Sequence, residues 1–317
     1  WKTDTQNQWT LGAITRALQE KFRDLNNTWK EFFKGERGYP KWRSRHRHNS
    51  FRDYYMKIDG NRICIPKVGW VRAFEEMPLQ IECQNANISK VGEKWWVSVQ
   101  WRIPKLKPAP NKKPEVGIDM GIAKWATCSD GWVVDAPEGA LKELDRLQKR
   151  RLFYQKKLSR RAKGSSRRIK AREQLAKVSE RIAQIKRNWS HTISKHLVEK
   201  YGKIALEELA IANMTKSAKG TTEQPGKNVK AKAGLNRSIL AQNWYQFRQY
   251  LEYKMRQAGG ELVMVDPQYT SQTCSSCGHV DAKNRISQDK FKCVKCGHAE
   301  NADLNASRNI FKKAFGG

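Results

Sequence analysis

The fold of the longer part of the chain is decided by Glu115-Val-Gly-Ile-Asp119-Met-Gly-Ile-Ala-Lys-Trp-Ala-Thr-Cys128. This pattern predicts a buried strand, a turn at Gly121 and a second strand, which together form a hairpin. Asp119 lies inside the apolar strand, between Ile118 and Met120. A carboxylate among strand residues loses its hydration unless a cation meets it, so Asp119 is a candidate site residue.

Two further acids occupy comparable positions. Glu207 ends the apolar stretch Lys203-Ile-Ala-Leu-Glu207, and Asp303 opens the last predicted helix. Three carboxylates that converge from separate segments repel one another until divalent metal neutralises them, and such a cluster suits two-metal phosphodiester hydrolysis. The plain alternatives are a helix N-cap for Asp303 and a strand-end charge for Glu207. Spacing along the sequence does not show by itself that the three acids meet.

The C-terminal part contains two Cys-x-x-Cys-Gly turns, at residues 274–278 and 293–297. Each turn presents two thiolates on one side, and two such pairs make the tetrahedral four-sulfur cage that zinc prefers. Two disulfides would need an oxidising compartment, which nothing else in the sequence indicates. We therefore expect Cys274, Cys277, Cys293 and Cys296 to hold one structural Zn²⁺ with no open coordination position.

The charge balance points to a polyanionic partner. Lys and Arg number 62 against 31 Asp and Glu, which gives a formal net charge of +31 over 317 residues. So much like charge opposes compaction unless a polyanion such as nucleic acid is bound. A ribosomal-type binder or a disordered basic tail would show the same charge, but 12 Trp and a hydrophobic share of 38% argue against disorder. No apolar run approaches the about 20 residues of a membrane span, and we expect a cytosolic protein without a signal peptide.

The first third of the sequence divides into a helical and a β-rich stretch. Apolar residues recur at threes and fours over residues 11–33, which predicts an amphipathic helix. Residues 39–48 interleave cations with aromatic side chains, a pattern that suits phosphate contact and base stacking but also occurs in solvated loops. Residues 51–104 are strand-like and are interpreted as a small antiparallel barrel, followed by a linker rich in Pro and Lys.

Residues 141–163 and 169–200 predict an antiparallel helical hairpin with a coiled-coil-like seam. Between residues 142 and 187 there are 18 Lys or Arg against 4 Asp or Glu. A charge run is usually a solvated face, but this imbalance favours a surface that follows a phosphate backbone. Residues 216–233, poor in hydrophobic residues, are expected to form a mobile loop, and residues 239–258 a single helix.

The sequence as a whole resembles the TnpB (OrfB) family. The resemblance rests on Asp119 within Gly-Ile-Asp-Met-Gly, Glu207 within Leu-Glu-Glu-Leu, and Cys-x-x-Cys pairs followed by Asn-Ala-Asp-Leu-Asn-Ala. Members of this family are insertion-sequence proteins related to the type V CRISPR effectors. The resemblance covers nearly the whole chain, from Leu11 to Ile310.

The resemblance implies a multidomain α+β protein built around an RNase H-like (RuvC) nuclease domain. It implies a helical recognition segment at 1–48, a wedge-like β-barrel at 49–113, the nuclease domain at 114–266 and 300–317, and a zinc-ribbon target-binding domain at 267–299. Because the chain begins at Trp1, we expect the recognition segment to be incomplete. Asp119, Glu207 and Asp303 would bind two catalytic Mg²⁺, Asn305 would position metal or substrate, and Glu208 is the poorer match to the second acid.

The activity implied is RNA-guided DNA cleavage. A guide RNA from the transposon end would pair with double-stranded target DNA beside a short target-adjacent motif. A guided repressor without cleavage and an RNA-independent RNase H-like nuclease or transposase remain alternatives, and a monomer is expected. Arg16 and Gln19 match positions beside the target-adjacent duplex in relatives. The charge and aromatic patterns add further nucleic-acid-binding candidates, which are Trp42, Arg43, Arg45, Arg47, Arg52, Lys156, Arg160, Arg161, Arg167 and Arg168.

Overall fold

The computed structural model describes residue 5 and residues 14–41, 49–54, 56–77, 83–91, 94–101, 108–136, 138–221 and 223–316. The chain divides into two compact units, Trp1–Leu106 and Lys107–Gly317, and each is considered by itself. No helix in these described ranges is long and apolar enough to cross a lipid bilayer.

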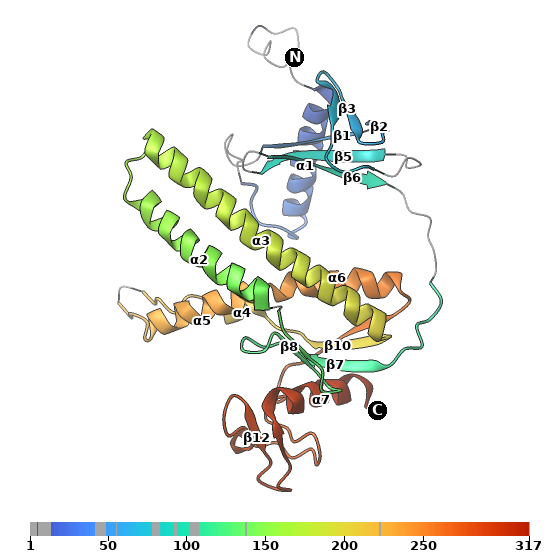
Figure 1. Ribbon diagram of the computed structural model, residues 1–317, viewed down its shortest axis with the longest axis vertical. Helices are drawn as coiled ribbons and strands as arrows, with labels where there is room; N and C mark the ends of the chain where they lie inside the picture. The colour runs from blue at the N-terminus through green and yellow to red at the C-terminus, as the bar shows by residue number, and fades with distance from the viewer. Residues whose placement is uncertain are drawn as a thin grey trace. The chain divides into compact units, whose positions relative to one another are not determined.

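Among its described residues, the first unit combines one helix with two antiparallel sheets (Figure 1). The helix is α1 (Thr15–Phe33), whose apolar side carries Trp29 and Phe32 against Tyr39. One sheet has the order β1 (Ser50–Tyr54), β5 (Cys83–Val91), β6 (Lys94–Trp101), and the other β2 (Lys57–Asp59), β3 (Arg62–Ile65), β4 (Gly69–Arg72).

The β-rich prediction for this unit is confirmed, but the closed barrel is not. In the part of the chain that the structure describes, the six strands form two separate three-stranded sheets. The sheets share one small core, which includes Ile63 of β3 together with Ala86 and Ile88 of β5. The strand pattern specified antiparallel pairing, but it carried no information on how the sheet edges would join.

The second unit is built on a five-stranded sheet with the order β11-β10-β7-β8-β9. Its strands are β7 (Glu115–Asp119), β8 (Ala126–Cys128), β9 (Val133–Val134), β10 (Lys203–Glu207) and β11 (Glu261–Val265). The predicted hairpin is confirmed by the antiparallel pairing of β7 with β8. Strands β7, β10 and β11 run parallel, so their carboxyl ends lie at one edge of the sheet.

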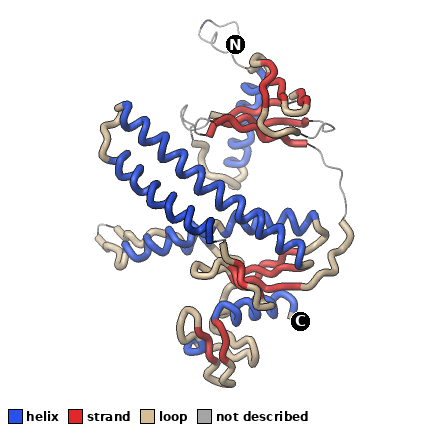
Figure 2. Tube along the Cα trace, viewed as in Figure 1, coloured by secondary structure: helices blue, strands red, loops and turns tan. Residues whose placement is uncertain are grey.

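Helices cover both faces of this sheet, as Figures 1 and 2 show. On one face Val116, Ile118, Ile204 and Leu206 pack against helices α3 (Ser166–Lys200) and α6 (Trp244–Gln257). On the other face Ala205 packs against α7 (Ala302–Phe315). Because side chains alternate along a strand, apolar runs such as Val116-Gly-Ile118 serve both faces at once.

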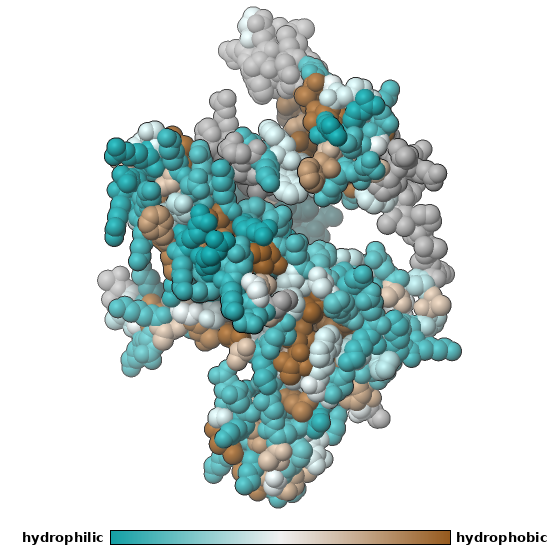
Figure 3. All heavy atoms as spheres, in the orientation of Figure 1, coloured by the Kyte–Doolittle hydropathy of each residue, from teal (hydrophilic) through white to brown (hydrophobic). Residues whose placement is uncertain are grey.

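The predicted helical hairpin is formed by α2 (Glu138–Ser159) and α3. Leu147 of α2 packs against Val178 and Ile182 of α3, which confirms the seam. The visible face of the hairpin is covered mainly by hydrophilic residues (Figure 3).

Two expectations for residues 211–258 are wrong. The segment expected to be a loop, residues 216–233, contains the start of α5 (Val229–Gln242), and a short helix α4 (Ile211–Met214) precedes that segment. The helix expected over 239–258 is broken between α5 and α6 at Asn243, whose φ is 61°. Asparagine tolerates this left-handed conformation better than other non-glycine residues, so the chain turns there while the apolar pattern continues.

The cysteine-rich segment is a small ribbon that precedes α7. It contains the 3₁₀ turn η2 (Ala282–Asn284) and a hairpin of β12 (Lys290–Lys292) with β13 (Ala299–Asn301). Strand β13 ends at Asn301 and α7 begins at Ala302, so the ribbon passes into the last helix without an intervening loop.

Candidate active site

The three acids predicted from the sequence lie at the carboxyl edge of the five-stranded sheet. Asp119 ends β7 and Glu207 ends β10, one residue beyond the parallel pair Ile118–Leu206. Neighbouring strands lie about 4.8 Å apart, so the two carboxylates leave the sheet side by side. Asp303 is the second residue of α7. The N-cap role belongs to Asn301, whose side chain accepts from the backbone N–H groups of Asp303 and Leu304 at 3.1 and 3.3 Å.

Asp119, Glu207 and Asp303 line one cavity of about 330 Å³. Lys124, Trp244, Thr270 and Arg285 contribute to the same walls. Glu208, the poorer match, lies outside it, because its side chain is 66% exposed and 3.8 Å from Arg248. The four cysteine sulfurs all lie within 4.8 Å of one another. Within the described residues no other group of three or more potential metal ligands is as close together, so the three carboxylates are farther apart than the four sulfurs.

Burial raises the pKa of all three acids, and repulsion from the other two adds to the rise at Asp119. The pKa of Asp119 is raised from 3.8 to about 7, first by burial and then by the negative charges of Glu207 and Asp303. Burial also raises the pKa of Glu207 and of Asp303. The hydrogen bond from Thr270 and the charges of Arg285 and Lys313 act in the opposite direction at Glu207. Buried acids that are poorly neutralised by their own protein are suited to binding divalent cations.

Two residues of this site were not found by sequence reasoning. The guanidinium of Arg285, a residue of the ribbon, lies 3.9 Å from the Asp303 carboxylate. Its positive charge offsets part of the rise in pKa at all three acids. Thr270 donates a hydrogen bond of 2.5 Å to Glu207. Nothing distinguished Arg285 from the other basic residues of so cationic a chain, and a single threonine carries no spacing signal.

The four predicted zinc ligands come together in the ribbon. Cys274 and Cys296 have their sulfurs 3.7 Å apart, and Cys277 and Cys293 have theirs 3.6 Å apart. The edge of a zinc–sulfur tetrahedron is about 3.8 Å for bonds of about 2.3 Å, so the four thiols fit Zn²⁺. In each turn the glycine adopts a positive φ, 73° at Gly278 and 74° at Gly297, which an amino acid with a side chain rarely adopts.

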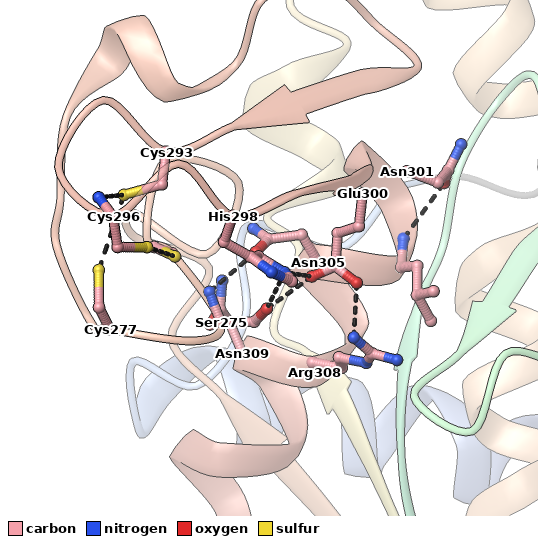
Figure 4. A network of polar contacts seen from close by, with 12 residues as sticks. Ser275, Cys277, Cys293, Cys296, His298, Glu300, Asn301, Asn305, Arg308 and Asn309 are labelled. Atoms are coloured by element: carbon pink, nitrogen blue, oxygen red, sulfur yellow. Dashed lines mark hydrogen bonds and ion pairs between the residues drawn. The ribbon is translucent and has the colours of Figure 1, made fainter.

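The ribbon is fastened to α7 by buried polar contacts (Figure 4). Asn305 is fully buried, accepts from the backbone N–H of Ser275 at 2.8 Å and donates to the carbonyl of Thr273 at 2.8 Å. Its amide therefore braces the first cysteine turn, which corrects the expectation that it positions metal or substrate. Glu300 accepts from the Ser275 hydroxyl at 2.5 Å and from Arg308 at 2.6 Å.

Three nucleic-acid-binding candidates of the first unit, Arg16, Gln19 and Arg52, lie around the buried acid Glu20. Arg16 and Gln19 line a cavity of about 580 Å³ together with Glu20 and Tyr54. Arg52 lies 3.9 Å from the Glu20 carboxylate, which also accepts from the Tyr54 hydroxyl at 2.8 Å. Trp42, Arg43, Arg45 and Arg47 lie outside the described residues.

The candidates of the second unit surround the turn between α2 and α3. Lys156, Arg160 and Arg167 are exposed, and Arg161 is partly buried. Arg168 has a different task, because its guanidinium donates to the carbonyls of Leu158 and Arg161 at 2.6 and 2.7 Å and closes the turn. The turn therefore presents cations on a rigid helical end.

Comparison with known proteins agrees with this architecture. A family model described as "Probable transposase" (OrfB_IS605) matches residues 96–218, and one described as "Cas12f1-like, TNB domain" matches residues 244–310. One solved structure, a cryo-EM structure of a Cas12f1-sgRNA-target DNA complex, shares the fold with a TM-score of 0.54 at 18% identity. The match covers 93% of this chain and 70% of that chain. The fold is that of a multidomain α/β nuclease.

The chain is 37% identical over 313 residues to a protein of Escherichia coli (strain K12) named "Putative RNA-guided DNA endonuclease InsQ", covering 98% of this chain and 77% of that protein. It is 52% identical over 75 residues to the Cas12f1 endodeoxyribonuclease of Sulfoacidibacillus thermotolerans, which covers 23% of this chain and 18% of that protein. The chain belongs to the TnpB (OrfB) family.

Proposed function

We propose that the protein is an RNA-guided endonuclease that hydrolyses both strands of a target DNA next to a short target-adjacent motif. The observation that carries the proposal is the single cavity lined by Asp119, Glu207 and Asp303. The name and 37% identity of the E. coli relative support the guided activity. The excess of 62 Lys and Arg over 31 Asp and Glu suits a protein that holds RNA and DNA together.

The proposed catalytic ligands are Asp119, Glu207 and Asp303, which would hold two Mg²⁺. When bound, the ions would supply an activated water and neutralise the charge that develops on the phosphate and the leaving oxygen. The protein contributes the rest. Burial leaves the carboxylates poorly neutralised and thus receptive to cations. Arg285 and Lys124 add positive charge at the wall of the cavity, where a DNA phosphate would enter.

The proposed domain assignment follows the same reasoning. Residues 114–266 and 300–317 would form the RNase H-like (RuvC) domain, because both contribute acids to the same edge of the sheet. Residues 267–299, with one structural Zn²⁺, would form the target-binding ribbon. Residues 1–48 and 49–113 would be the recognition segment and the wedge domain. The exposed cations at the α2–α3 turn would contact nucleic-acid backbone.

The test is the dependence of cleavage on co-purifying RNA. We expect the protein, when it is expressed together with its natural flanking DNA and purified, to carry a structured RNA. One end of this RNA, 3′ or 5′, should be a guide segment of variable sequence. Ribonuclease treatment of the complex before addition of matching double-stranded DNA and Mg²⁺ should abolish cutting, because base pairing supplies the sequence recognition. Adding back the synthetic RNA should restore it. Cleavage that persists unchanged after ribonuclease treatment would contradict the guided activity.

A further inference from the structure

One face of α7 clamps the loop that connects β11 to the first cysteine turn. Asn305, Asn309 and Lys313 recur every four residues and therefore lie on the same side of the helix. Asn305 donates to the carbonyl of Thr273 at 2.8 Å, and Asn309 donates to the carbonyls of Thr270 and Thr273 at 2.8 and 2.7 Å. Lys313 donates to the carbonyls of residues 266 and 268 at 3.0 and 2.5 Å. The loop over residues 266–275 is thus fixed along most of its length.

Thr270 lies in the middle of this clamped loop and is only 3% exposed. Its hydroxyl lies 2.5 Å from Oε1 of Glu207 and 3.0 Å from the carbonyl of Pro267. A hydroxyl has one hydrogen to donate, and a charged carboxylate at the shorter distance is the stronger acceptor. Within the described residues, this is the one hydrogen bond to the Glu207 carboxylate.

A glutamate at a strand end has three rotatable side-chain bonds, so its carboxylate does not hold one orientation unless something fixes it. The Thr270 hydroxyl engages one carboxylate oxygen of Glu207, whose side chain lines the same cavity as Asp119 and Asp303. The backbone that carries this hydroxyl is held in turn, because Asn309 donates to the carbonyl of the same residue. The chain of contacts therefore runs from α7 through the loop to the second acid.

We propose that Thr270 is a positioning residue that fixes the carboxylate of Glu207 for binding divalent metal. The proposal rests on the proposed function, in which Glu207 is a metal ligand. Losing the hydroxyl releases the carboxylate into several rotamers, of which only some face the cavity. The cost falls on metal binding, so excess metal compensates for it.

The experiment compares Thr270→Val and Thr270→Ser with the control Thr273→Val in the RNA-loaded protein. Thr273 belongs to the same loop, but its hydroxyl donates to the carbonyl of Tyr269 at 2.7 Å and reaches no acid. Two quantities are measured, which are the dissociation constant for Mn²⁺ by electron paramagnetic resonance and the Mg²⁺ concentration for half-maximal DNA cleavage. Zinc content and thermal unfolding show whether each variant is folded.

We expect Thr270→Val to raise both metal concentrations about tenfold, the usual effect of one hydrogen bond to a charged group. Its cleavage rate at saturating Mg²⁺ should approach that of the wild type. Thr270→Ser, which keeps the hydroxyl, and Thr273→Val should both stay within about twofold of the wild type, a range below the effect of one such hydrogen bond.

The proposal is overturned if Thr270→Val binds Mn²⁺ like the wild type, or if Thr273→Val weakens metal binding equally. If Thr270→Val does not fold, Thr270→Ser decides, because a tenfold loss in a serine variant of normal zinc content contradicts a role for the hydroxyl. The two proposals fail separately. A wild-type protein that binds Mn²⁺ but never cuts guided DNA refutes the nuclease function, whereas the comparison of Mn²⁺ affinities still judges Thr270.

Discussion

Replacing Asp119 with Asn should reduce DNA cleavage by at least about a thousandfold and leave binding of guide and target intact. The reduction is expected because an amide cannot neutralise catalytic metal as a carboxylate does, and metal supplies several kcal/mol of transition-state stabilisation. Binding should survive because the surfaces rich in Lys and Arg are untouched. The result separates a nuclease from a guided repressor. A guided repressor has no cleavage activity to lose, so the substitution would leave its behaviour unchanged. An Asp119→Asn protein that still cuts DNA would refute the proposed mechanism.

In the absence of Mg²⁺, the same substitution should make the protein more stable above neutral pH. The pKa of Asp119 is raised to about 7, above its value of 3.8 in an unfolded chain. Because the folded pKa is above the unfolded one, the contribution of Asp119 to the free energy of unfolding is fully present below pH 4. It is lost as the pH rises through 7, where Asp119 ionises in the folded protein beside Glu207 and Asp303. At pH 8 the difference between Asn and Asp is on the order of 4 kcal/mol at most, since one pKa unit corresponds to about 1.4 kcal/mol.

Thermal unfolding at pH 5 and pH 8 measures this effect, in buffer without added divalent ions and without chelator, so that zinc stays bound. The Asp119→Asn protein should unfold at a higher temperature than the wild type at pH 8, and the difference should be less than half as large at pH 5, where the pH lies only about one unit above the unfolded-chain pKa of 3.8. Added Mg²⁺ should raise the unfolding temperature of the wild type at pH 8 and so remove its disadvantage. Glu208→Gln is the matched control, because this neighbouring acid is 66% exposed and should change neither cleavage nor the pH dependence.

Replacing Gly117 with Ala should destabilise the second unit by about 3 kcal/mol or more and abolish cleavage. A Cβ atom at Gly117 would lie 2.4 Å from the carbonyl oxygen of Ser307 and 2.4 Å from the backbone nitrogen of Phe311. Both atoms belong to the backbone of α7, so no side chain can turn aside. Helix α7 must move away from β7, and it carries Asp303 with it.

Denaturant unfolding and the cleavage assay test this prediction together. Gly139→Ala is the control, because a Cβ at Gly139 of α2 meets nothing within 4 Å. Alanine favours a helix, so this variant should be as stable as the wild type or slightly more stable. A Gly117→Ala protein of wild-type stability would show that α7 does not rest on β7 as closely as the structure indicates.

The elements of the second unit were predictable because their patterns are local. The hairpin at 115–128, the strands ending at Glu207 and Val265, and the seam between α2 and α3 all follow from the alternation or helical spacing of apolar residues. The cysteine cluster follows from two turns of fixed spacing. The start of α5 was not predicted because it has few apolar residues, and its helix forms instead on Lys and Ala, which favour helices by their own propensity.

The candidate site was only partly predictable because it depends on pairing between distant segments. Each acid could be found from its place, Asp119 within an apolar strand, Glu207 at the end of one and Asp303 at the start of a helix, although the structure ends β7 at Asp119. The three acids come close together because β7 pairs in parallel with β10 and because α7 packs on β7. Neither arrangement produces a pattern in the local sequence. Thr270 and Arg285 are ordinary residues in loops, and only the folded chain brings them to Glu207 and Asp303.

The most direct measurement of the central claim is anomalous X-ray scattering from crystals of the RNA-loaded protein soaked in Mn²⁺. We predict two peaks about 4 Å apart, the usual separation in two-metal sites, within contact of Asp119, Glu207 and Asp303. Both peaks should disappear or weaken strongly in the Asp119→Asn protein while the zinc signal at the four cysteines remains. Ordered Mn²⁺ elsewhere on the protein, with none in the cavity of the three acids, would contradict the account.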